Sequence, residues 1–580
     1  MRLLNFFTPI LALFISASAF AQTQTARVMV VHNSPDPAAD TVDIYVGNTL
    51  AGYTKLDNVA YLSATNFIDL PAGVALDVGI APSNSVDEND SIFSRTLTLM
   101  NNETYTVFAN GLLNPGSYNL PAGRDASFDL DIYATAEETA STGKVELQVH
   151  HGSPDAPAVE VQARDVAVLA DNADFRDFTS YAEIDATEYI IDLFTEDLSA
   201  HIATYEADLT ALDGEGVIAF ASGFADPNNG SASFGIYAVV DLDNTGADVI
   251  QLAEIENTTL QIIHNSADPA ASSVDVYVDG TRLLDDFDFR TATEFIDYDG
   301  GDITVGIAAG NSNSVDDTLK SWNVRLMPGE EYVVIANGVV DPNNFAANPD
   351  GRDIGLDLYA TLARQMSANA GNLDANIFHG ATDAPFVDVL ANRQVVLVDD
   401  AAYGDFTGYL NITPAEYILD VTDSSQNVVV ATYNQDLSGL ADSATVVMAS
   451  GFLSPSDNND GEAFGLFAVL PNGDVIPFTV ENSAFVQVIH NSPDPAADSV
   501  DIYLNGNLAL DNFKFREGTP YLDLPVGNVE SEIGVALGNS NESGNGYDDT
   551  LVSFNYNLTS LNYYQLIAYG MPTVGFEPNP

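Results

Sequence analysis

The stretch "VHNSPDPAADTVDIYV", residues 31–46, places a histidine at the end of an apolar run, then a turn rich in proline and aspartate, then an alternating strand pattern. Close variants return as "VHHGSPDAPAVEVQA", "IIHNSADPAASSVDVYV", "IFHGATDAPFVDVLA" and "VIHNSPDPAADSVDIYL". The aligned histidines are His32, His151, His264, His379 and His490, at spacings of 119, 113, 115 and 111 residues. Each spacing is the length of a small domain rather than of a solenoid turn, so the sequence predicts five tandem domains.

The five repeats fall into two types that alternate along the chain. Repeats 1, 3 and 5 (type A) carry "HNSPDPAAD" or "HNSADPAAS", whereas repeats 2 and 4 (type B) carry "DAP" and then "DFTSY" or "DFTGY". The order A-B-A-B-A indicates duplication of a two-domain pair. The expected segments are a leader at 1–21 and repeats at 22–140, 141–256, 257–369, 370–482 and 483–580.

Within a repeat, the dominant signal is alternation with period two, in short runs bounded by Pro, Gly, Asn and Asp. No run shows a sustained helical period. The strands expected in repeat 1 are Arg27 to His32, Val42 to Val46, Asn66 to Leu70, Leu76 to Ala81, Phe93 to Leu99, Tyr105 to Ala109 and Phe128 to Tyr133. This pattern predicts an all-β chain of five immunoglobulin-like antiparallel β-sandwich domains, arranged as beads on a string.

Repeat 5 ends soon after "YYQLIAYGMPTVGF", which aligns with "TYTVFANGLLNPGS" of repeat 1. It therefore lacks a counterpart of the last strand of repeat 1, "FDLDIYATA". We expect a truncated domain, although an open sheet edge or a strand from another chain would also fit the pattern.

The charge balance limits the partners of the chain. Its 580 residues hold 17 Lys and Arg against 84 Asp and Glu, for a formal net charge of −67. This excess repels phosphate backbones and anionic membranes, so nucleic-acid binding is not expected. The acidic residues are spread along the whole chain, which is typical of negative charge that keeps a protein soluble.

The N-terminus indicates a secreted protein, and the lack of cysteine suggests that its source is bacterial. Arg2 precedes an apolar stretch, and the small-x-small sequence from Ala19 to Ala21 is typical of a signal-peptide cleavage site. With no cysteine, the chain has neither disulfides nor thiolate sites. We expect a bacterial protein at the cell surface or outside the cell, with no membrane insertion after cleavage of the leader.

Strand parity suggests a structural role for the repeated histidines. In "KVELQVHH", His151 shares a face with Val145, Leu147 and Val149, and this face points inward, whereas His150 points to solvent. An inward imidazole can bond to the following turn, where an aspartate is a natural partner or cap. The expected structural latch consists of His32 with Asp36, His151 with Asp155, His264 with Asp268, His379 with Asp383 and His490 with Asp494.

Catalytic and metal-binding roles fit the phrase less well. A zinc site lacks a second histidine in four of the five phrases, and Asp43 has outward parity with Tyr45. Ser34 lies between His32 and Asp36, but residues this close in one turn do not reach triad geometry. No nucleophile elbow, zincin motif or phosphate-binding loop occurs in the sequence, so no enzyme activity and no catalytic residue are expected.

The phrases "HGSPDAPAVEVQA" and "VDVYVDG" resemble the domain-of-unknown-function 4397 family of secreted bacterial and archaeal proteins. The resemblance extends over essentially the whole chain after the leader. It implies an extracellular β-rich module, often in tandem, and it implies no established activity or ligand. The type A repeats depart from it with Asp-Pro-Ala in place of Asp-Ala-Pro, and repeat 4 has Ala381-Thr382 in place of Ser-Pro.

Acidic loops supply the remaining candidate chemistry. The type A repeats carry "SNSVDENDS", "NSNSVDDT" and "NSNESGNGYDDT" at matching places, and repeat 4 carries "SPSDNNDGEAFG". Calcium favours such oxygen-rich loops, although the same residues also make ordinary turns. The candidate calcium ligands are Asp87, Glu88, Asp90, Asp316, Asp317, Asp457, Asp460, Asp548 and Asp549.

Two classes of function fit these observations. The first is a structural or adhesive protein, secreted or at the cell surface, with no catalytic activity. The second is an array of carbohydrate- or polymer-binding modules, which needs an exposed aromatic platform in each repeat. Trp322 is the only tryptophan, so such a platform would depend on Tyr and Phe. The expected partner is a surface protein or a polysaccharide.

Overall fold

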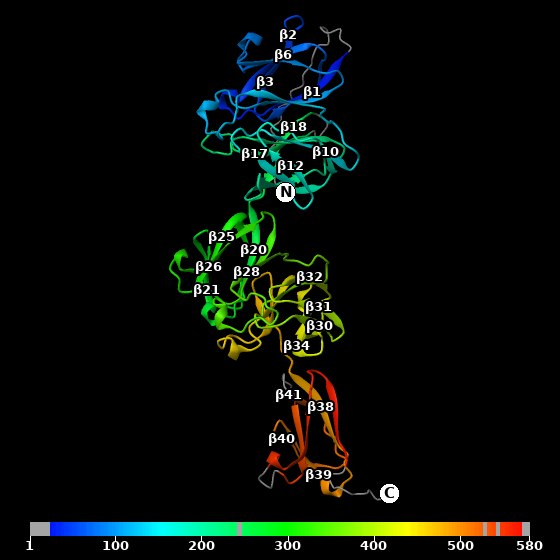
Figure 1. Ribbon diagram of the computed structural model, residues 1–580. Coiled ribbons are helices and arrows are strands. Elements are labelled where there is room, and N and C mark those ends of the chain that lie inside the picture. Colours follow the sequence, from blue (N-terminus) through cyan, green and yellow to red (C-terminus); the bar gives the residue numbers. More distant parts are fainter. Residues whose placement is uncertain (1–23, 241–245, 526–530, 541–545, 571–580) are drawn as a thin grey trace. The chain divides into compact units, whose positions relative to one another are not determined.

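The computed structural model describes residues 24–240, 246–525, 531–540 and 546–570 (Figure 1). Within these ranges the chain consists of β-strands joined by loops and short 3-10 turns. No helix in the described part is long and apolar enough to cross a membrane. The prediction of an all-β chain of tandem sandwiches is confirmed.

The strands of the type A repeats follow one common order. Those of repeat 1 are β1 (Thr25–His32), β2 (Thr41–Asn48), β3 (Gly52–Ala60), β4 (Ser63–Ala64), β5 (Ile68–Pro71), β6 (Ala75–Pro82), β7 (Phe93–Thr98), β8 (Thr104–Asn110) and β9 (Asp129–Ala134). Those of repeat 3 are β20 (Asn257–His264), β21 (Ser273–Val278), β22 (Thr281–Asp288), β23 (Thr291–Ala292), β24 (Ile296–Asp299), β25 (Gly301–Ala309), β26 (Thr318–Leu326), β27 (Glu331–Asn337) and β28 (Asp357–Leu362). Those of repeat 5 are β38 (Ser483–His490), β39 (Ser499–Leu504), β40 (Asn507–Lys514), β41 (Leu522–Pro525), β42 (Ser531–Leu537), β43 (Thr550–Tyr556) and β44 (Tyr563–Ala568).

The type B repeats add strand pairing near their C-terminal ends. Repeat 2 has β10 (Lys144–His151), β11 (Val159–Ala163), β12 (Ala167–Ala173), β13 (Ala182–Asp185), β14 (Glu188–Thr195), β15 (His201–Asp208), β16 (Gly216–Ser222), β17 (Gly235–Val240), β18 (Asp248–Gln251) and β19 (Ala253–Glu254). Repeat 4 has β29 (Leu373–His379), β30 (Val387–Ala391), β31 (Val395–Ala401), β32 (Phe406–Ile412), β33 (Glu416–Asp423), β34 (Val429–Asp436), β35 (Ala444–Ser450), β36 (Gly465–Val469) and β37 (Val475–Pro477). The strands β18 and β19 pair with β17 and β15, so this segment closes both sheets of its own repeat.

Each repeat is a sandwich of two sheets. In repeat 1 one sheet has the order β4-β1-β8-β9, with β5 also on β1, and the other has the order β3-β2-β6-β7. One pair departs from the expected antiparallel arrangement, because β1 runs parallel to β8, as β10 does to β16 and β38 to β44. The parallel pair places the end of each histidine strand beside the end of a second strand, where the next loop begins.

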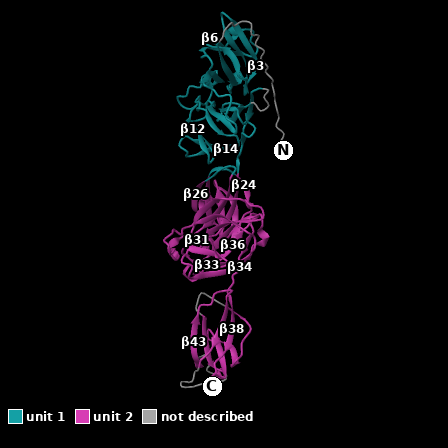
Figure 2. Ribbon diagram, turned by 90° about the vertical axis from the view of Figure 1, so that its right-hand side faces the viewer, with its two compact units in different colours: residues 1–257, 299–302, 325–329 teal, residues 258–298, 303–324, 330–580 magenta. Residues whose placement is uncertain are grey.

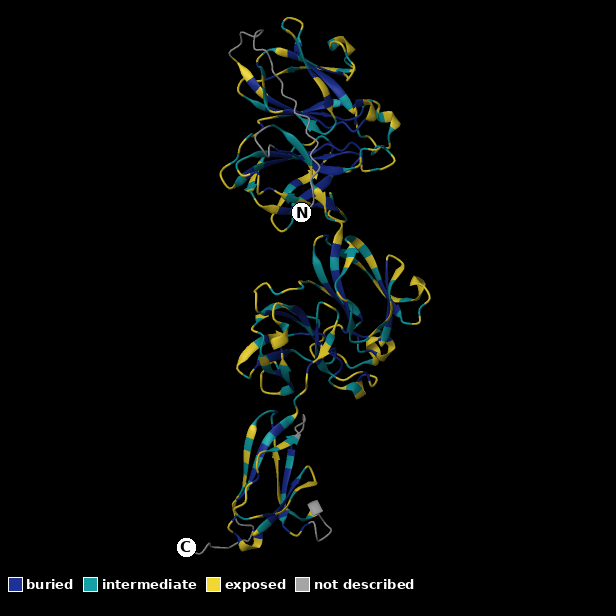
Figure 3. Ribbon diagram, turned by 180° about the vertical axis from the view of Figure 1, so that it is seen from behind, coloured by how far each residue is buried: buried dark blue, intermediate teal, exposed yellow. Residues whose placement is uncertain are grey.

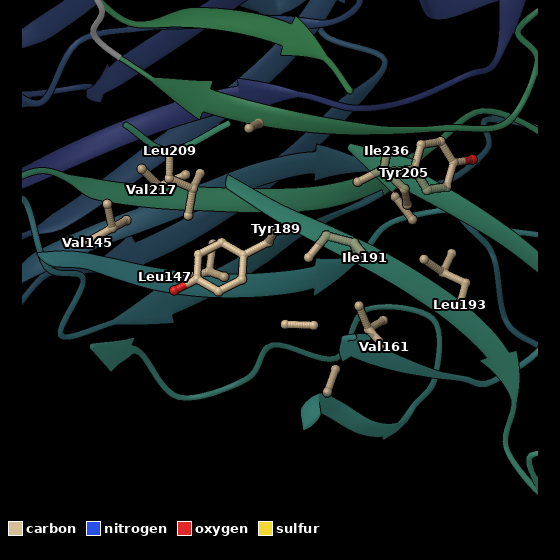
Figure 4. Close-up of a cluster of buried hydrophobic side chains, with 14 of the residues drawn as sticks. Val145, Leu147, Val161, Tyr189, Ile191, Leu193, Tyr205, Leu209, Val217 and Ile236 are labelled. Atoms are coloured by element: carbon tan, nitrogen blue, oxygen red, sulfur yellow. The ribbon is translucent and has the colours of Figure 1, made fainter. Parts of the chain in front are cut away.

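Alternating residues of the two sheets fill the interior of each sandwich. In repeat 2, Val145 and Leu147 of the first sheet face Val161, Ile191 and Leu193 of the second (Figure 4). Repeats 1, 3, 4 and 5 have equivalent apolar clusters of their own. Each repeat therefore carries its own core, as the tandem pattern predicts.

Contacts group the chain into two compact units (Figure 2). The first contains repeats 1 and 2 together with residues 299–302 and 325–329. The second contains the rest of repeat 3 with repeats 4 and 5. Repeat 1 thus shares a unit with repeat 2, and repeat 3 shares one with repeat 4.

Candidate functional site

The repeated histidine ends its strand and bonds to the turn that follows. His32 Nε2 lies 2.6 Å from Ala39 O, and its Nδ1 accepts a hydrogen bond from Ser34 N at 3.5 Å. These partners place the proton on Nε2 and define a neutral tautomer. The ring is buried, and burial lowers the pKa of His32 below its usual value. This geometry ties the end of β1 to the start of β2.

The other four histidines occupy the same place. Nε2 lies 2.7 Å from Ala271 O for His264 and 2.7 Å from Ala497 O for His490. In the type B repeats the acceptor is a proline carbonyl, at 3.0 Å for His151 and 3.2 Å for His379. Burial lowers the pKa of His151, His264 and His379.

The aspartate of the repeated phrase caps a turn and holds a distant loop. Asp36 Oδ1 accepts from Ala38 N at 2.9 Å, at the start of the 3-10 turn η1 (Pro37–Ala39), and its Oδ2 accepts from Leu113 N at 2.9 Å. Asp268 accepts in the same way from Ala270 N and Val340 N. Asp494 caps the turn η9 (Pro495–Ala497) through Ala496 N.

In the type B repeats the aspartate accepts from backbone amides of the distant loop, and Asp155 also accepts from Ser153 Oγ of its own turn at 3.4 Å. Asp155 accepts from Ala225 N at 2.8 Å and Asp226 N at 2.9 Å. Asp383 accepts from Leu453 N at 2.9 Å and Ser454 N at 2.8 Å. In all five repeats the carboxylate therefore bonds to backbone amides, while the histidine bonds to a carbonyl.

The acidic loops that the sequence offers for calcium form short turns at the surface. Asp87 caps η2 (Glu88–Asp90) and Asp90 Oδ2 accepts from Val86 N at 2.7 Å. Asp317 completes a capping box with Ser314 at η5 (Val315–Asp317). The other residues of this set, Asp457 in η8 (Pro455–Asp457), Asp460 beside it, and Asp548 and Asp549 in η10 (Gly546–Asp549), also lie in turns.

No three His, Asp or Glu side chains gather in a metal-binding arrangement within the described residues. In the loops of repeats 1 and 3, the carboxylates of Asp87, Asp90 and Asp317 instead accept hydrogen bonds from nearby backbone amides. The turn-forming role of the loops is thus visible in the structure, and calcium binding stays a prediction.

A second apolar cluster joins repeat 1 to repeat 2 outside either core. It consists of outward residues of β1, β8, β16 and β17: Met29, Val31, Phe108, Ile218, Phe220, Tyr237 and Val239. Phe108 and Phe220 hold equivalent positions in their repeats, and their ring centroids are 5.2 Å apart. Repeats 3 and 4 meet through the equivalent cluster: Ile263, Val333, Ile335, Phe378, Val446, Met448 and Val469. Each of these two type A repeats is thus paired face to face with the type B repeat that follows it.

An asparagine and a glycine face each other at this interface. Asn33, directly after the latch histidine of repeat 1, donates from Nδ2 to Gly152 O at 3.4 Å and to Ala221 O at 3.3 Å. A Cβ on Gly152 would overlap Asn33 Nδ2. In the second pair a Cβ on Gly380 would overlap Nδ2 of Asn265 in the same way. The pairing therefore requires asparagine on the type A side and glycine on the type B side.

Other polar contacts fix the pairs in register. Gln261 Nε2 donates to Leu470 O of repeat 4 at 2.7 Å. Arg290, at φ 61°, donates from Nη2 to Ala463 O at 2.7 Å, and its guanidinium lies 4.7 Å from the ring centroid of Phe289 and 4.2 Å from that of Phe467. These donors satisfy carbonyls of the facing repeat, so the apolar contact has one specific register.

His150 departs furthest from the position that the sequence predicts. Parity correctly places it on the outer face of β10, but that face is covered, and His150 has no exposed surface. Its ring lies between Phe108 and Phe178, at centroid distances of 4.3 Å and 4.0 Å. Burial lowers the pKa of His150 to about 3, and burial raises the pKa of nearby Asp131 to about 6. The prediction of a solvent-facing histidine is wrong because repeat 1 occupies the space where solvent was expected.

Asp43 is also buried, contrary to its outward parity. Its side chain has no exposed surface and forms an ion pair with Lys55 at 2.7 Å. It also accepts from Ser85 Oγ at 2.5 Å and from Asn58 N at 2.9 Å. The long loop that carries Ser85 folds over the outer face of β2, a long-range contact that strand periodicity does not reveal.

Repeat 2 contains a cavity of about 210 Å³ between its two sheets. Its walls are mostly apolar and include Leu147, Ile184, Ile191 and Leu252. The corresponding space in repeat 4 is about 30 Å³. At the position of Leu252, repeat 4 has the larger Phe478, which is buried in its core. This leucine therefore accounts for part of the additional space.

Exposed aromatic side chains are confined to one repeat of the described chain. Those of high exposure are Tyr521, Phe554, Tyr556, Tyr563 and Tyr569, all in repeat 5. An array of carbohydrate- or polymer-binding modules needs a platform in every repeat. In the described parts of repeats 1 to 4, Tyr and Phe are instead buried or half-buried.

Comparison with known proteins identifies one family. The model of the family described as "Domain of unknown function (DUF4397)" matches residues 26–162, 258–376, 374–458 and 484–578. No curated relative matches the chain.

Solved structures resemble the chain only distantly. One, described as "Alpha-glucan binding by a streptococcal virulence factor", is 12% identical, with a TM-score of 0.13, covering 33% of this chain and 92% of its own. Another, "The Bacillus anthracis TIE protein", is 8% identical, with a TM-score of 0.14, covering 80% of this chain and 74% of its own. Scores this low carry no argument about function.

Proposed function

Because the chain belongs to the DUF4397 family, which is described only as a domain of unknown function, we propose a role from its own architecture: a non-catalytic extracellular protein with a structural or adhesive role, built from rigid A–B pairs. The observation that carries this proposal is the second apolar cluster in each pair. Separation of repeat 1 from repeat 2 would expose Phe108 and Phe220, both fully buried. Each pair therefore acts as one rigid block rather than as two flexibly linked domains.

The leader predicted at residues 1–21, which lie outside the described part of the chain, supports an extracellular location for this role. The described histidines support the absence of catalysis, because each latch imidazole uses Nε2 to bond a backbone carbonyl. These five imidazoles are also buried, which keeps them away from a substrate in solution.

Single-molecule stretching tests the rigid-pair role. The full chain without its leader is pulled from both ends, and the length released in each unfolding step is measured. We expect repeats 1 and 2 to lose their mutual contacts in a distinct step before the separate sandwiches unfold. The variant Phe108→Ala should lower the force of that step, whereas Leu551→Ala, at an exposed position in repeat 5, should not. Five independent steps with no pairing step would refute the proposal.

A second candidate function, binding of a small apolar ligand, is favoured by the cavity of repeat 2. An apolar space of this size accepts small hydrophobic molecules in other proteins. Titration with benzene, followed by the chemical shifts of the methyl groups of Leu147 and Ile191, tests this candidate. Unchanged shifts at saturating benzene would rule it out.

A further inference from the structure

Repeat 5 exposes the sheet face that repeats 1 and 3 use for pairing (Figure 3). Ile567 occupies the position of Phe108 and Ile335, because each precedes the alanine that pairs with the latch histidine. Its side chain is 49% exposed, whereas Phe108 and Ile335 are fully buried. Tyr563, at the start of the same strand β44, is 66% exposed, and Tyr521, directly before β41, is 43% exposed. This apolar face has no cover in the described structure.

The open face repeats the contact residues by which repeat 3 holds repeat 4. Arg516 has φ 67° and lies 4.9 Å from the ring centroid of Phe515, much as Arg290 lies over Phe289. The residues of repeat 5 at the contact positions are Gln487, Ile489, Asn491, Phe515, Arg516 and Ile567, and all six are identical in repeat 3. Other positions of the face differ: Gln565 stands in place of Val333, Tyr521 in place of Phe295, Gly518 in place of Ala292 and Tyr569 in place of Asn337. Repeat 5 thus presents the same kind of type A face as repeat 3, and no partner covers this face in the described structure.

The asparagine of this face restricts which partner it accepts. Asn491 follows the latch histidine His490, and its backbone N–H donates to Ala568 O as that of Asn265 does to Ala336 O. Asn265 is buried against Gly380, where a Cβ would overlap its side chain. Two type A faces in the same arrangement would set asparagine against asparagine at that point. A second copy of repeat 5 is therefore sterically excluded from this pairing, and a type B face is required.

We propose that the open face of repeat 5 binds a further type B repeat, other than repeats 2 and 4, in the arrangement that joins repeats 3 and 4. The equivalent faces of repeats 2 and 4 are already covered by repeats 1 and 3, so the type B repeat that binds here is neither of these two. The partner presents glycine after its latch histidine, an apolar side chain opposite Ile567 and a free backbone carbonyl for Arg516. This inference depends on the observed pairing and not on the mechanical role proposed above.

A titration of the full chain with a type B domain tests the proposal. The probe is repeat 4 alone, residues 370–482, whose two sheets and core are its own. Circular dichroism first establishes that the probe is folded, and calorimetry then measures its binding to the full chain without the leader. We expect saturable binding at one site. Ile567→Asp should weaken it at least tenfold, whereas Leu551→Asp, at an exposed position on β43 in the other sheet, should change it less than twofold.

Several outcomes would overturn the proposal. One is that the folded probe does not bind, and another is that the two variants weaken its binding equally. The others are that the chain alone forms a dimer that Ile567→Asp abolishes, and that a soluble α-glucan displaces the probe. If the isolated probe does not fold, residues 370–482 are attached to the end of the full chain through a flexible linker. Hydrogen exchange at 563–569 should then slow at least tenfold relative to the unextended chain, and unchanged exchange would equally overturn the proposal.

Discussion

Asp131 Oδ2 lies 3.7 Å from His150 Nε2 at the interface between repeats 1 and 2. The second pair has neither group, because Tyr359 and Phe378 occupy the equivalent positions, with ring centroids 5.2 Å apart. The two pairs therefore share one geometry but differ in the chemistry at its centre. The first contains two buried titratable groups where the second is aromatic.

This difference predicts a pH dependence that a single substitution removes. The pKa of His150 is about 3 in the folded chain and about 6.5 when unfolded, so below pH 6.5 only the unfolded state takes up the proton. The His150 side chain therefore makes the free energy of unfolding of the first pair decrease as the pH falls below about 6.5. Relative to the native chain, His150→Phe should gain about 1.4 kcal/mol in this free energy per pH unit below 6.5.

Asp131 changes the unfolding free energy with pH in the opposite direction. It is present both in the native chain and in His150→Phe. Its pKa of about 6 lies above the unfolded value, so the folded state protonates first and the unfolding free energy rises as the pH falls from 6 to 4. In His150→Phe this contribution remains, and the latch histidines also remain unchanged. Calorimetric unfolding at pH 7.5, 6.5 and 5.5 checks the difference between the two chains. Parallel pH curves would show that His150 does not titrate as the geometry indicates.

Truncation of the interface should be costly only where a partner covers it. Phe108→Ala leaves a cavity between Phe220 and His150, and we expect it to reduce the unfolding free energy of the first pair by about 3–5 kcal/mol. Ile567→Ala, at the equivalent but half-exposed position of repeat 5, should cost about 1 kcal/mol. Chemical denaturation of the two variants provides the comparison. Similar losses in both would argue against the second apolar cluster as a source of stability.

The sequence predicts the repeats, the sandwich fold and the inward direction of the latch histidines, because all three depend on local periodicity. It does not reveal the burial of His150, which it places in solvent, or of Asp43, to which it gives an outward direction, because alternation within one strand carries no information about a second domain or a distant loop. A signal for the pairing is nevertheless present. "RVMVVH" in β1 and "GVIAFAS" in β16 are apolar on both faces, which is typical of strands covered on both sides. The asparagine and glycine after the histidine become meaningful only when the two repeats are seen together.

The turn aspartate should contribute far more stability than an acid of the exposed loops. Asp268 is buried and accepts from Ala270 N and Val340 N, both at 2.8 Å. Asp268→Ala leaves both amides without this acceptor, and we expect a loss of about 3 kcal/mol in the unfolding free energy of repeat 3. Asp316→Ala, in the exposed turn of the same repeat, should change it by less than about 0.5 kcal/mol. Thermal unfolding distinguishes the two, and a larger effect at Asp316 would assign the loop a role beyond that of a turn.

The cavity of repeat 2 should be fillable by the residue that repeat 4 uses. Leu252→Phe places an aromatic ring where Phe478 packs in repeat 4, and we expect it to raise the unfolding free energy of repeat 2 by about 1 kcal/mol. The reciprocal change, Phe478→Leu, should lower that of repeat 4 by a similar amount, because it removes buried surface and leaves a void. Thermal unfolding of both variants measures the two shifts. A loss of stability in Leu252→Phe would mean that the walls of the cavity do not admit the ring, and that its volume is kept open by the surrounding strands.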